Sequence, residues 1–407
     1  MPGSPRFTRP SDDGNGIDRR TAVSWMSAAV ASAAWPGSLD VSAGDLSSEL
    51  QSTTGRTRVR KIATEEAFTI PEIAAALRDV VRRGGPNLDL KLLRLIYDTP
   101  AEAAPAGQAA PAGSRDALAR TFLPRLLDIG AGRLGDMDAN GVDMHLLSLT
   151  MPGVQMFDPA TAVSLARLSN DRLSEAVRSH PTRFAGLASF APQDPLAAAK
   201  EMERAINTLK LNGVIVNSHT QNGYLDEPRF WPILEAAEAL GTPLYIHPRA
   251  PSDGMAAPFN DYRMEGSIWG YGMETGTHAV RLILSGVLDR FPRLRIVLGH
   301  MGEALPFWLW RLDYMAAPGS RADLRNRLKA SEYFRRNFAI TTSGLEDPLV
   351  LRFCVDKIGI DSVMWAIDYP YQPTAPAVAF LESATLSEDE RERIGHRNAE
   401  RIFGLRP

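Results

Sequence analysis

Four side chains of the kinds that bind metal ions and transfer protons stand at the ends of short apolar or β-branched runs: Glu65, His247, His300 and Asp368. A charged group directly after such a run is costly to bury unless it is paired, hydrogen-bonded or bound to a metal. Glu65, His247 and Asp368 offer one nitrogen and two carboxylates, a set that suits Mn²⁺ or Mg²⁺ better than a closed Zn²⁺ site, with Zn²⁺ as the alternative. These residues predict a divalent metal centre with open coordination positions.

The fourth residue, His300, stands apart because Glu303 follows it three positions later in Gly299-His-Met-Gly-Glu303. If the chain turns into a helix there, the carboxylate can orient the imidazole, an arrangement typical of general acid–base catalysis. A capping pair without chemistry is the alternative. For His247 the alternative is an imidazole that bonds a backbone carbonyl, and for Asp368 it is a cap of the following helix.

Short runs rich in apolar and β-branched residues alternate with amphipathic stretches from residue 59 onward, which predicts a parallel sheet with helices outside it. The predicted strands are residues 61–65, 144–149, 184–188, 213–217, 243–247, 295–300, 338–342 and 363–368, and the clearest helices are 160–180, 196–209 and 229–240. Eight such units indicate an α/β fold of the (β/α)8 TIM-barrel class. No glycine-rich phosphate loop follows the first strand, which argues against a dinucleotide-binding fold. Barrel enzymes carry their active sites at the carboxyl ends of the strands, where the four residues stand.

The barrel is expected to span residues 58–407, with a flexible insertion at the Ala/Pro/Gly-rich segment 101–113. Residues 1–57 lack a periodic pattern. They are interpreted as a disordered tail or as a twin-arginine export signal, because Arg19 and Arg20 precede a mild apolar stretch. The predicted location is the cytoplasm, or the periplasm or cell exterior if the signal operates.

Composition narrows the classes of partner. The 407-residue chain has a formal net charge of -3 and no basic stripe, which argues against binding nucleic acid. No apolar run approaches the ~20 residues that a membrane-spanning helix needs. The single cysteine, Cys354, cannot form an internal disulfide, and its apolar setting favours a small buried residue over a nucleophile.

Several motifs carry a resemblance to a known family. They are Ala63-Thr-Glu-Glu-Ala-Phe68, Ser218-His-Thr-Gln221, Tyr245-Ile-His-Pro248, Gly299-His-Met-Gly-Glu-Ala-Leu-Pro306 and Asp368-Tyr-Pro-Tyr-Gln372. With them the chain from about residue 61 to 405 resembles the metal-dependent aromatic acid decarboxylases of the amidohydrolase superfamily. These include the 5-carboxyvanillate decarboxylases, which it resembles most, and the γ-resorcylate and 2,3-dihydroxybenzoate decarboxylases.

The resemblance implies roles for the candidate residues. Metal ligands fall on Glu65, His247 and Asp368, and an acid–base pair falls on His300 and Glu303. It also implies one divalent ion, Mn²⁺ first, no organic cofactor, and assembly as a homodimer or homotetramer. An arginine that a neighbouring subunit supplies in this family has only Arg115 and Arg120 as candidates. The substrate contacts that we expect are Thr150, His219, Arg249 and Tyr371.

We therefore expect a decarboxylase that releases CO2 from a small aromatic acid with a hydroxyl ortho to the carboxylate. In this hypothesis Asp368 donates the proton. Hydrolytic members of the superfamily open with His-x-His, whereas this chain has Glu65-Glu-Ala67, so a two-metal hydrolase is disfavoured. Arg249 departs from the 5-carboxyvanillate pattern and matches the dihydroxybenzoate enzymes, which leaves the ring substituents open. The alternatives are a hydrolase of a lactone or amide that uses metal-bound water, and a catalytically inactive relative.

Overall fold

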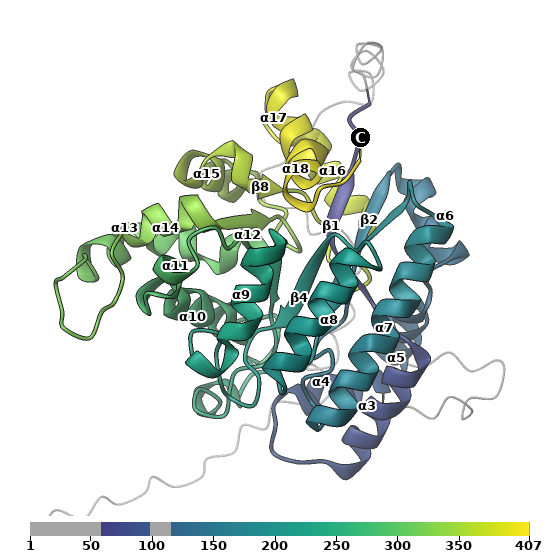
Figure 1. Ribbon diagram of the computed structural model, residues 1–407. Coiled ribbons are helices and arrows are strands. Elements are labelled where there is room, and N and C mark those ends of the chain that lie inside the picture. The colour runs from purple at the N-terminus through teal and green to yellow at the C-terminus, as the bar shows by residue number, and fades with distance from the viewer. Residues whose placement is uncertain (1–57, 98–114, 407) are drawn as a thin grey trace, which may run out of the picture. The chain divides into compact units, whose positions relative to one another are not determined.

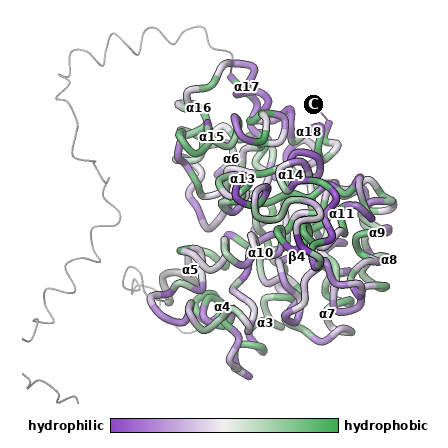
Figure 2. The backbone as a smooth tube through the Cα atoms, turned by 90° about the vertical axis from the view of Figure 1, so that its left-hand side faces the viewer, coloured by the Kyte–Doolittle hydropathy of each residue, from purple (hydrophilic) through white to green (hydrophobic). Residues whose placement is uncertain are grey.

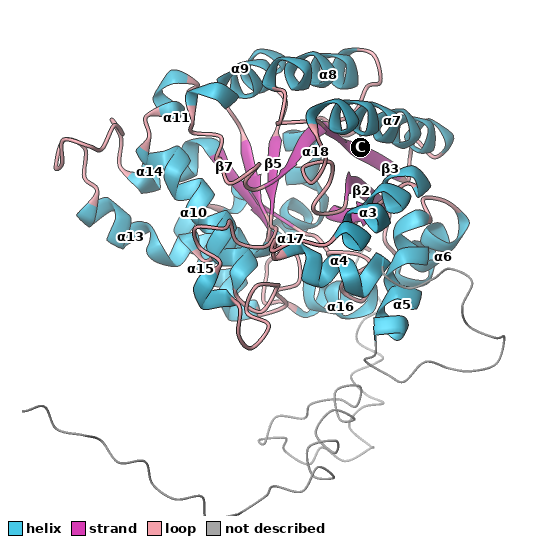
Figure 3. Cartoon of the chain, turned by 90° about the horizontal axis from the view of Figure 1, so that it is seen from below, coloured by secondary structure: helices cyan, strands magenta, loops and turns pink. Residues whose placement is uncertain are grey.

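The computed structural model describes residues 58–97 and 115–406 (Figure 1). Within them eight strands lie in sequence order, each parallel to the next. They are β1 (Ile62–Phe68), β2 (Met144–Leu149), β3 (Phe184–Ser189), β4 (Gly213–Asn217), β5 (Leu244–His247), β6 (Ile296–Leu298), β7 (Phe338–Thr341) and β8 (Val363–Met364). Seen from below, the strands form an inner layer that the helices surround (Figure 3). The predicted (β/α)8 barrel is confirmed. The predicted export segment and the insertion at 101–113 lie outside the described residues.

Helices connect the strands and cover the outside of the barrel. The first half contains α3 (Pro71–Arg83), α4 (Asp89–Tyr97), α5 (Arg115–Leu127), α6 (Ala131–Asn140), α7 (Pro159–Ser179), α8 (Pro195–Asn207) and α9 (Trp231–Leu240). The second half contains α10 (Gly270–Leu284), α11 (Val287–Arg290), α12 (His300–Glu303), α13 (Leu305–Met315), α14 (Ala330–Asn337), α15 (Pro348–Ile358), α16 (Thr374–Ser383), α17 (Glu388–Glu392) and α18 (Asn398–Phe403). Short helical turns are η1 (Pro228–Phe230), η2 (Ala257–Phe259), η3 (Ile360–Ser362) and η4 (Arg393–Arg397).

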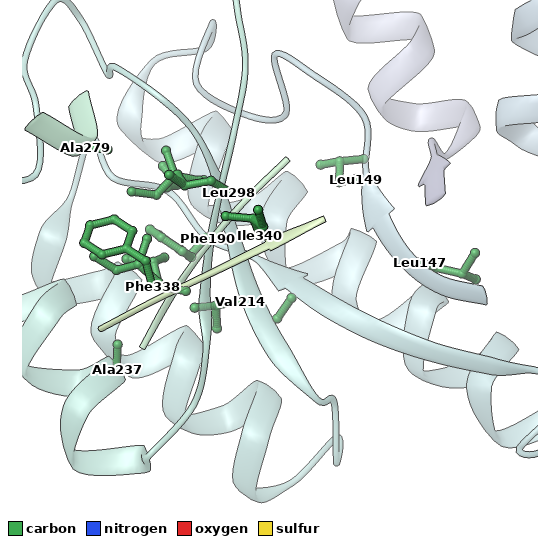
Figure 4. Packing of buried hydrophobic residues seen from close by; sticks show 14 of the residues in the cluster. Leu147, Leu149, Phe190, Val214, Ala237, Ala279, Leu298, Phe338 and Ile340 are labelled. Carbon is green, nitrogen blue, oxygen red and sulfur yellow. The ribbon is translucent and has the colours of Figure 1, made fainter. Parts of the chain in front are cut away.

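The barrel packs through an inner and an outer apolar layer. Inside the strands lies a cluster of Ile62, Met144, Leu146, Ala185, Leu187, Ile215, Tyr245, Val297, Ala339 and Met364, which Phe403 and Leu405 from the C-terminal end join. Outward-facing strand residues such as Val214, Leu298 and Ile340 belong to a second cluster with Ala237 of α9 and Ala279 of α10 (Figure 4). The helices alternate between hydrophilic and hydrophobic residues along the chain (Figure 2), as amphipathic helices do when one face covers a sheet.

A buried glutamate completes the junction between β1 and the chain that follows β8. The register of β1 against β2 shifts between Ala63 and Glu66. The Glu66 carboxylate accepts hydrogen bonds from the backbone N–H groups of Ile367 and Tyr369, at 3.0 Å each. Beside it, the Ala67 N–H donates to the carbonyl of Tyr369 at 2.7 Å. The side chain of Glu66 therefore accepts hydrogen bonds from backbone N–H groups that would bond to a neighbouring strand in a regular sheet.

Three strands end two or more residues away from the predicted position, and the other boundaries agree to within one residue. β1 continues past Glu65 to Phe68, so Glu65 lies inside the strand and not at its end. β6 ends at Leu298, before His300, because the chain leaves the extended conformation there. β8 is only Val363–Met364, since the residues that follow it do not continue a regular strand pairing. Instead the carbonyl of Trp365 accepts from the N–H of Thr64 in β1, and the N–H of Ile367 donates to the side chain of Glu66. In the described parts of the chain no helix is both long and apolar enough to cross a bilayer.

Candidate metal centre and substrate cavity

Glu65, His247 and Asp368 come together at the carboxyl-end mouth of the barrel, although they come from β1, from β5 and from the segment that follows β8. One ligand atom from each lies within 4.8 Å of the others. The Nε2 atom of His247 is 3.4 Å from Oε1 of Glu65. The parallel arrangement of β1, β5 and β8 produces this grouping, because the carboxyl ends of parallel barrel strands face the same side.

The carboxylate of Glu65 is held through one oxygen and left open at the other. Its Oε2 atom accepts hydrogen bonds from the hydroxyls of Tyr245, Thr341 and Ser343, with Thr341 Oγ1 at 3.0 Å. Its Oε1 atom is buried and has no hydrogen-bond partner. Gly299 lies directly behind, where a Cβ atom would approach Oε2 to 2.6 Å. A buried carboxylate oxygen without a hydrogen bond fits the position of a cation ligand.

His247 and Asp368 are also oriented for coordination. The Nδ1–H of His247 donates to the carbonyl of Pro248 at 2.8 Å, so the Nε2 lone pair is directed toward Glu65. Asp368 has a φ of 73°, in the left-handed region that non-glycine residues rarely adopt. Its carbonyl accepts from the N–H groups of Tyr371 and Gln372 at 2.9 and 3.0 Å, which makes a tight turn. Asp368 does not cap a helix, because α16 begins only at Thr374.

His300 and Glu303 form a hydrogen-bonded pair on an unusual turn. The Nδ1 atom of His300 lies 2.9 Å from Oε1 of Glu303. We expected a right-handed helical turn, but all five residues from His300 to Ala304 have positive φ: 48°, 53°, 77°, 53° and 61°. For residues other than glycine this left-handed backbone costs about 1–2 kcal/mol per residue. The surrounding contacts must therefore hold the turn that aims the imidazole.

The turn places His300 beside the three candidate metal ligands and not among them. Its Nε2 atom is 3.9 Å from Oε1 of Glu65 and 3.9 Å from Oδ2 of Asp368. Burial alone would lower the pKa of His300, but the carboxylates of Glu303 and Glu65 outweigh it and raise that pKa well above 6.5. Burial raises the pKa of Asp368. The pKa values of the cluster therefore move in different directions: those of His300 and Asp368 are raised, and that of Glu65, despite its burial, is lowered by the nearby imidazoles of His300 and His247.

A cavity of about 760 Å³ opens onto this cluster, a volume suited to one small ring compound. His247, His300 and Asp368 line its inner end. The walls come from α4 and α5, from the segment after β2, from the long segment between β5 and α10 with the first turn of α10, and from the turn after β8. Their lining side chains include Leu88, Lys91, Arg94, Leu95, Phe122, Met151, Arg263, Glu265, Tyr271, Tyr371 and Gln372.

The four predicted substrate contacts take different places. Tyr371 lines the cavity, and its hydroxyl lies 2.6 Å from Oγ1 of Thr150. His219 and Arg249 are not among the lining residues. Both ring nitrogens of His219 face backbone groups, with Nε2 3.2 Å from the carbonyl of Ala250. Direct contact of His219 with a substrate therefore stays a prediction.

Arg249 is almost fully buried and is engaged by the protein itself. Its guanidinium forms an ion pair with Asp89 at the start of α4 and donates to the carbonyl of His219 at 2.9 Å. The second oxygen of Asp89 accepts from the N–H of Ala250 at 3.0 Å. In this arrangement Arg249 ties the segment after β5 to α4, which forms one cavity wall. Its contact with a substrate likewise stays a prediction.

Sequence reasoning missed several residues that shape the site. Tyr245 and Thr341 stand two residues before His247 and Ser343, on the same side of their strands, so alternation along a strand could have identified them. Asp89 lies on an amphipathic helix and carried no signal that it would meet Arg249. Cys354 is buried, and burial raises the pKa of its thiol to about 11, as suits a small core residue.

Comparisons with known proteins agree with this geometry. The family model described as amidohydrolase matches residues 122–405. The γ-resorcylate decarboxylase of Polaromonas sp. is 38% identical over 290 residues, which cover 69% of this chain and 89% of the relative. The crystal structure of 5-carboxyvanillate decarboxylase from Sphingomonas paucimobilis is 53% identical, with a TM-score of 0.79, over 86% of this chain and 100% of that one.

A second similar structure contains ligands. The 5-carboxyvanillate decarboxylase from Novosphingobium aromaticivorans is 38% identical, with a TM-score of 0.78, over 85% of this chain and 96% of that one. It holds manganese and 4-hydroxy-3-methoxy-5-nitrobenzoic acid.

Proposed function

The chain belongs to the amidohydrolase family, and we propose that it is a metal-dependent, non-oxidative decarboxylase of aromatic carboxylic acids with a hydroxyl ortho to the carboxylate. One observation carries the proposal: the buried, unpaired Oε1 of Glu65 beside His247 and Asp368, at the inner end of a cavity sized for one aromatic ring. The names of the similar enzymes, which act on hydroxylated benzoates, point the same way.

Glu65, His247 and Asp368 are the proposed metal ligands. Mn²⁺ is the first choice because oxygen-rich sites with one imidazole suit it and because similar decarboxylase structures contain manganese; Mg²⁺ and Zn²⁺ are the alternatives. When bound, a divalent ion would supply Lewis-acid stabilisation of negative charge on the phenolic oxygen of the substrate. No organic cofactor is required, because the phenol itself accepts the electron density.

The chain's own groups would move the proton. In our proposal the carboxyl group of Asp368 protonates the ring carbon that bears the carboxylate. The bond from that carbon to the carboxylate then breaks, its electrons return to the ring, CO2 leaves, and Asp368 regains a proton from solvent. His300, oriented by Glu303, would hold the hydroxyl or carboxylate of the substrate in place. Tyr371, backed by Thr150, would contact the ring or its substituents.

His219 and Arg249 enter the proposal differently from the sequence-based expectation. Their polar atoms contact protein groups in the structure, so we propose that they act mainly by holding the segments after β4 and β5 around the cavity. An Arg249→Met variant would then lower protein stability more than it changes the relative KM values of different substrates. If the variant is as stable as the wild type and its KM rises for some substrates only, Arg249 contacts the substrate directly.

The test is a CO2-release screen over ortho-hydroxybenzoates with protein loaded separately with Mn²⁺, Mg²⁺ or Zn²⁺. CO2 release from at least one acid supports the proposal, and the best metal identifies the preferred ion. If no acid releases CO2 but a lactone or amide is hydrolysed, the protein is a hydrolase. If it neither turns over nor gains thermal stability from Mn²⁺, it is an inactive relative.

We also propose that the protein assembles as a homodimer or homotetramer. α13 exposes Phe307 (71%), Trp310 (65%) and Tyr314 (69%), and α15 exposes Leu349 (80%) and Phe353 (41%). Several large apolar side chains on adjacent helices are uncommon on the surface of a monomer. Sedimentation velocity at micromolar concentration tests this, because a single monomer boundary would contradict it.

A further inference from the structure

Tyr271, the second residue of α10, lines the cavity and carries a hydroxyl with a weak hydrogen-bond partner. Its side chain lines the cavity together with Asp368 and Tyr371. Among the described residues, the hydrogen-bond contact of this hydroxyl is the sulfur of Met151 at 3.8 Å, and a thioether is a weak acceptor. Tyrosine hydroxyls in such settings usually have an oxygen or nitrogen partner. Tyr371 does have one, in Thr150, and is therefore a poorer candidate for a new contact.

The backbone fixes Tyr271 next to the proposed acid–base pair. Two glycines flank it, and both make close approaches. A Cβ atom on Gly270 would lie 2.6 Å from the carbonyl oxygen of Met264. A Cβ atom on Gly272 would lie 3.2 Å from Oε2 of Glu303. Because the first turn of α10 packs this tightly on the turn that carries Glu303, the position of Tyr271 relative to the reacting centre is well defined.

The hydroxyl remains a proton donor. Burial raises the pKa of Tyr271 well above 10, and the charge of Asp89 adds to this effect more than the charge of Asp368 does. The contact with Met151 places the hydroxyl beside the segment that follows β2. A neutral donor on a residue that lines the cavity can be satisfied by an acceptor oxygen of a bound ring compound.

We propose that Tyr271 donates a hydrogen bond to a second oxygen substituent on the substrate ring, separate from the hydroxyl and carboxylate that define the reaction. Tyr271 would thereby select aromatic acids that carry an additional hydroxyl or methoxy group over simple 2-hydroxybenzoate. This inference rests on the proposed decarboxylase function. It adds a specificity-determining residue that the sequence motifs do not indicate.

The experiment compares Tyr271→Phe with the wild-type enzyme, both loaded with Mn²⁺. The substrates are 2-hydroxybenzoate, the four dihydroxybenzoates that add a second hydroxyl to it at one of the free ring carbons, and 2-hydroxy-3-methoxybenzoate. Loss of one neutral hydrogen bond should lower kcat/KM about 3- to 12-fold for at least one doubly oxygenated acid. The value for 2-hydroxybenzoate should stay within about twofold. Tyr333→Phe, on α14 outside the cavity, removes a hydroxyl that donates to Asp289; it is the matched control and should change neither value.

An equal loss on every substrate, or no loss on any, overturns the inference. A second measurement separates its failure from failure of the proposed function. Calorimetric titration of the Mn²⁺-loaded proteins with 2-nitrophenol and 2-nitroresorcinol needs no turnover. If the wild type releases no CO2 but prefers 2-nitroresorcinol, and Tyr271→Phe removes that preference, the decarboxylase proposal fails and the role of Tyr271 stands. No preference in the wild type, or an unchanged preference in the variant, refutes the role of Tyr271.

Discussion

Replacing Tyr245 by phenylalanine should weaken metal binding without unfolding the barrel. Tyr245 is fully buried in β5, and its hydroxyl donates to Oε2 of Glu65. Phenylalanine keeps the ring in the core and removes only that donor. A hydrogen bond to a charged group contributes about 1.5–3 kcal/mol, and loss of a group that orients a metal ligand typically lowers affinity about 10- to 100-fold. Because Thr341 and Ser343 still hold the same oxygen, we expect a loss near the lower value, about 10-fold.

The assay is competition between the protein and a chelator of known Mn²⁺ affinity, with free Mn²⁺ followed by electron paramagnetic resonance. Excess Mn²⁺ should restore most of the turnover, because the missing hydroxyl positions Glu65 and does not contact the substrate. Tyr333→Phe is the matched control. Its hydroxyl donates to the carboxylate of Asp289 at 2.5 Å, outside the metal centre, so it should lose stability and keep its Mn²⁺ affinity. Unchanged affinity in Tyr245→Phe, or an equal loss in both variants, would refute the reasoning.

Three further predictions follow from the same structure. Asp368→Asn should lower turnover at least about 1000-fold in a CO2-release assay while the circular dichroism spectrum stays native, because the amide has no acidic proton for the ring; substantial turnover would contradict the proposed donor. Burial lowers the pKa of His278 to about 3, against about 6.5 in an unfolded chain. Below pH 6.5 the unfolded chain binds a proton at this residue and the folded chain does not. The contribution of His278 to the free energy of unfolding is therefore complete above pH 6.5 and falls by about 1.4 kcal/mol per pH unit toward pH 3. Urea unfolding at pH 7 and pH 5 should show a shallower pH dependence for His278→Gln, and an identical dependence would exclude this contribution. Gly302→Ala should lower the free energy of unfolding by about 1–3 kcal/mol, because its φ is 77° and a Cβ atom would lie 2.9 Å from Cγ2 of Ile340; equal unfolding midpoints would show that the left-handed turn tolerates a side chain.

The fold could be predicted largely from the sequence because its signals are local. Runs such as Gly213–Asn217 and Leu244–His247 are short, apolar and β-branched, and they alternate with amphipathic stretches long enough to be helices. The strand ends then identified the candidate residues, since a parallel barrel brings all of those ends to one mouth. In this way Glu65, His247 and Asp368 could be grouped before any distance was known.

The boundaries of the elements were less accessible. β1 continues to Phe68 because its last residues bond to the chain after β8. The residues that bond to Glu66 are 301 or more positions away from it in the sequence. The turn from His300 to Ala304 is left-handed although most of its residues disfavour that conformation. Packing of α10 through Gly272 and Gly276 against Glu303 holds it there. No local pattern encodes contacts of this kind.

The sequence alone determined which residue types gather at the barrel mouth, because the alternation of short apolar runs and amphipathic stretches shows which residues lie in or just after each strand. Only the tertiary structure decided how each group is used. It assigned one oxygen of Glu65 to three hydroxyls and left the other unpaired, and it turned Arg249 toward Asp89, 160 positions away in the sequence. It also placed Tyr271 in the cavity wall with a sulfur as the contact of its hydroxyl. The physical reason is that a hydrogen bond or ion pair depends on distances of a few ångströms between side chains from different strands and helices, and those distances exist only after the barrel has closed.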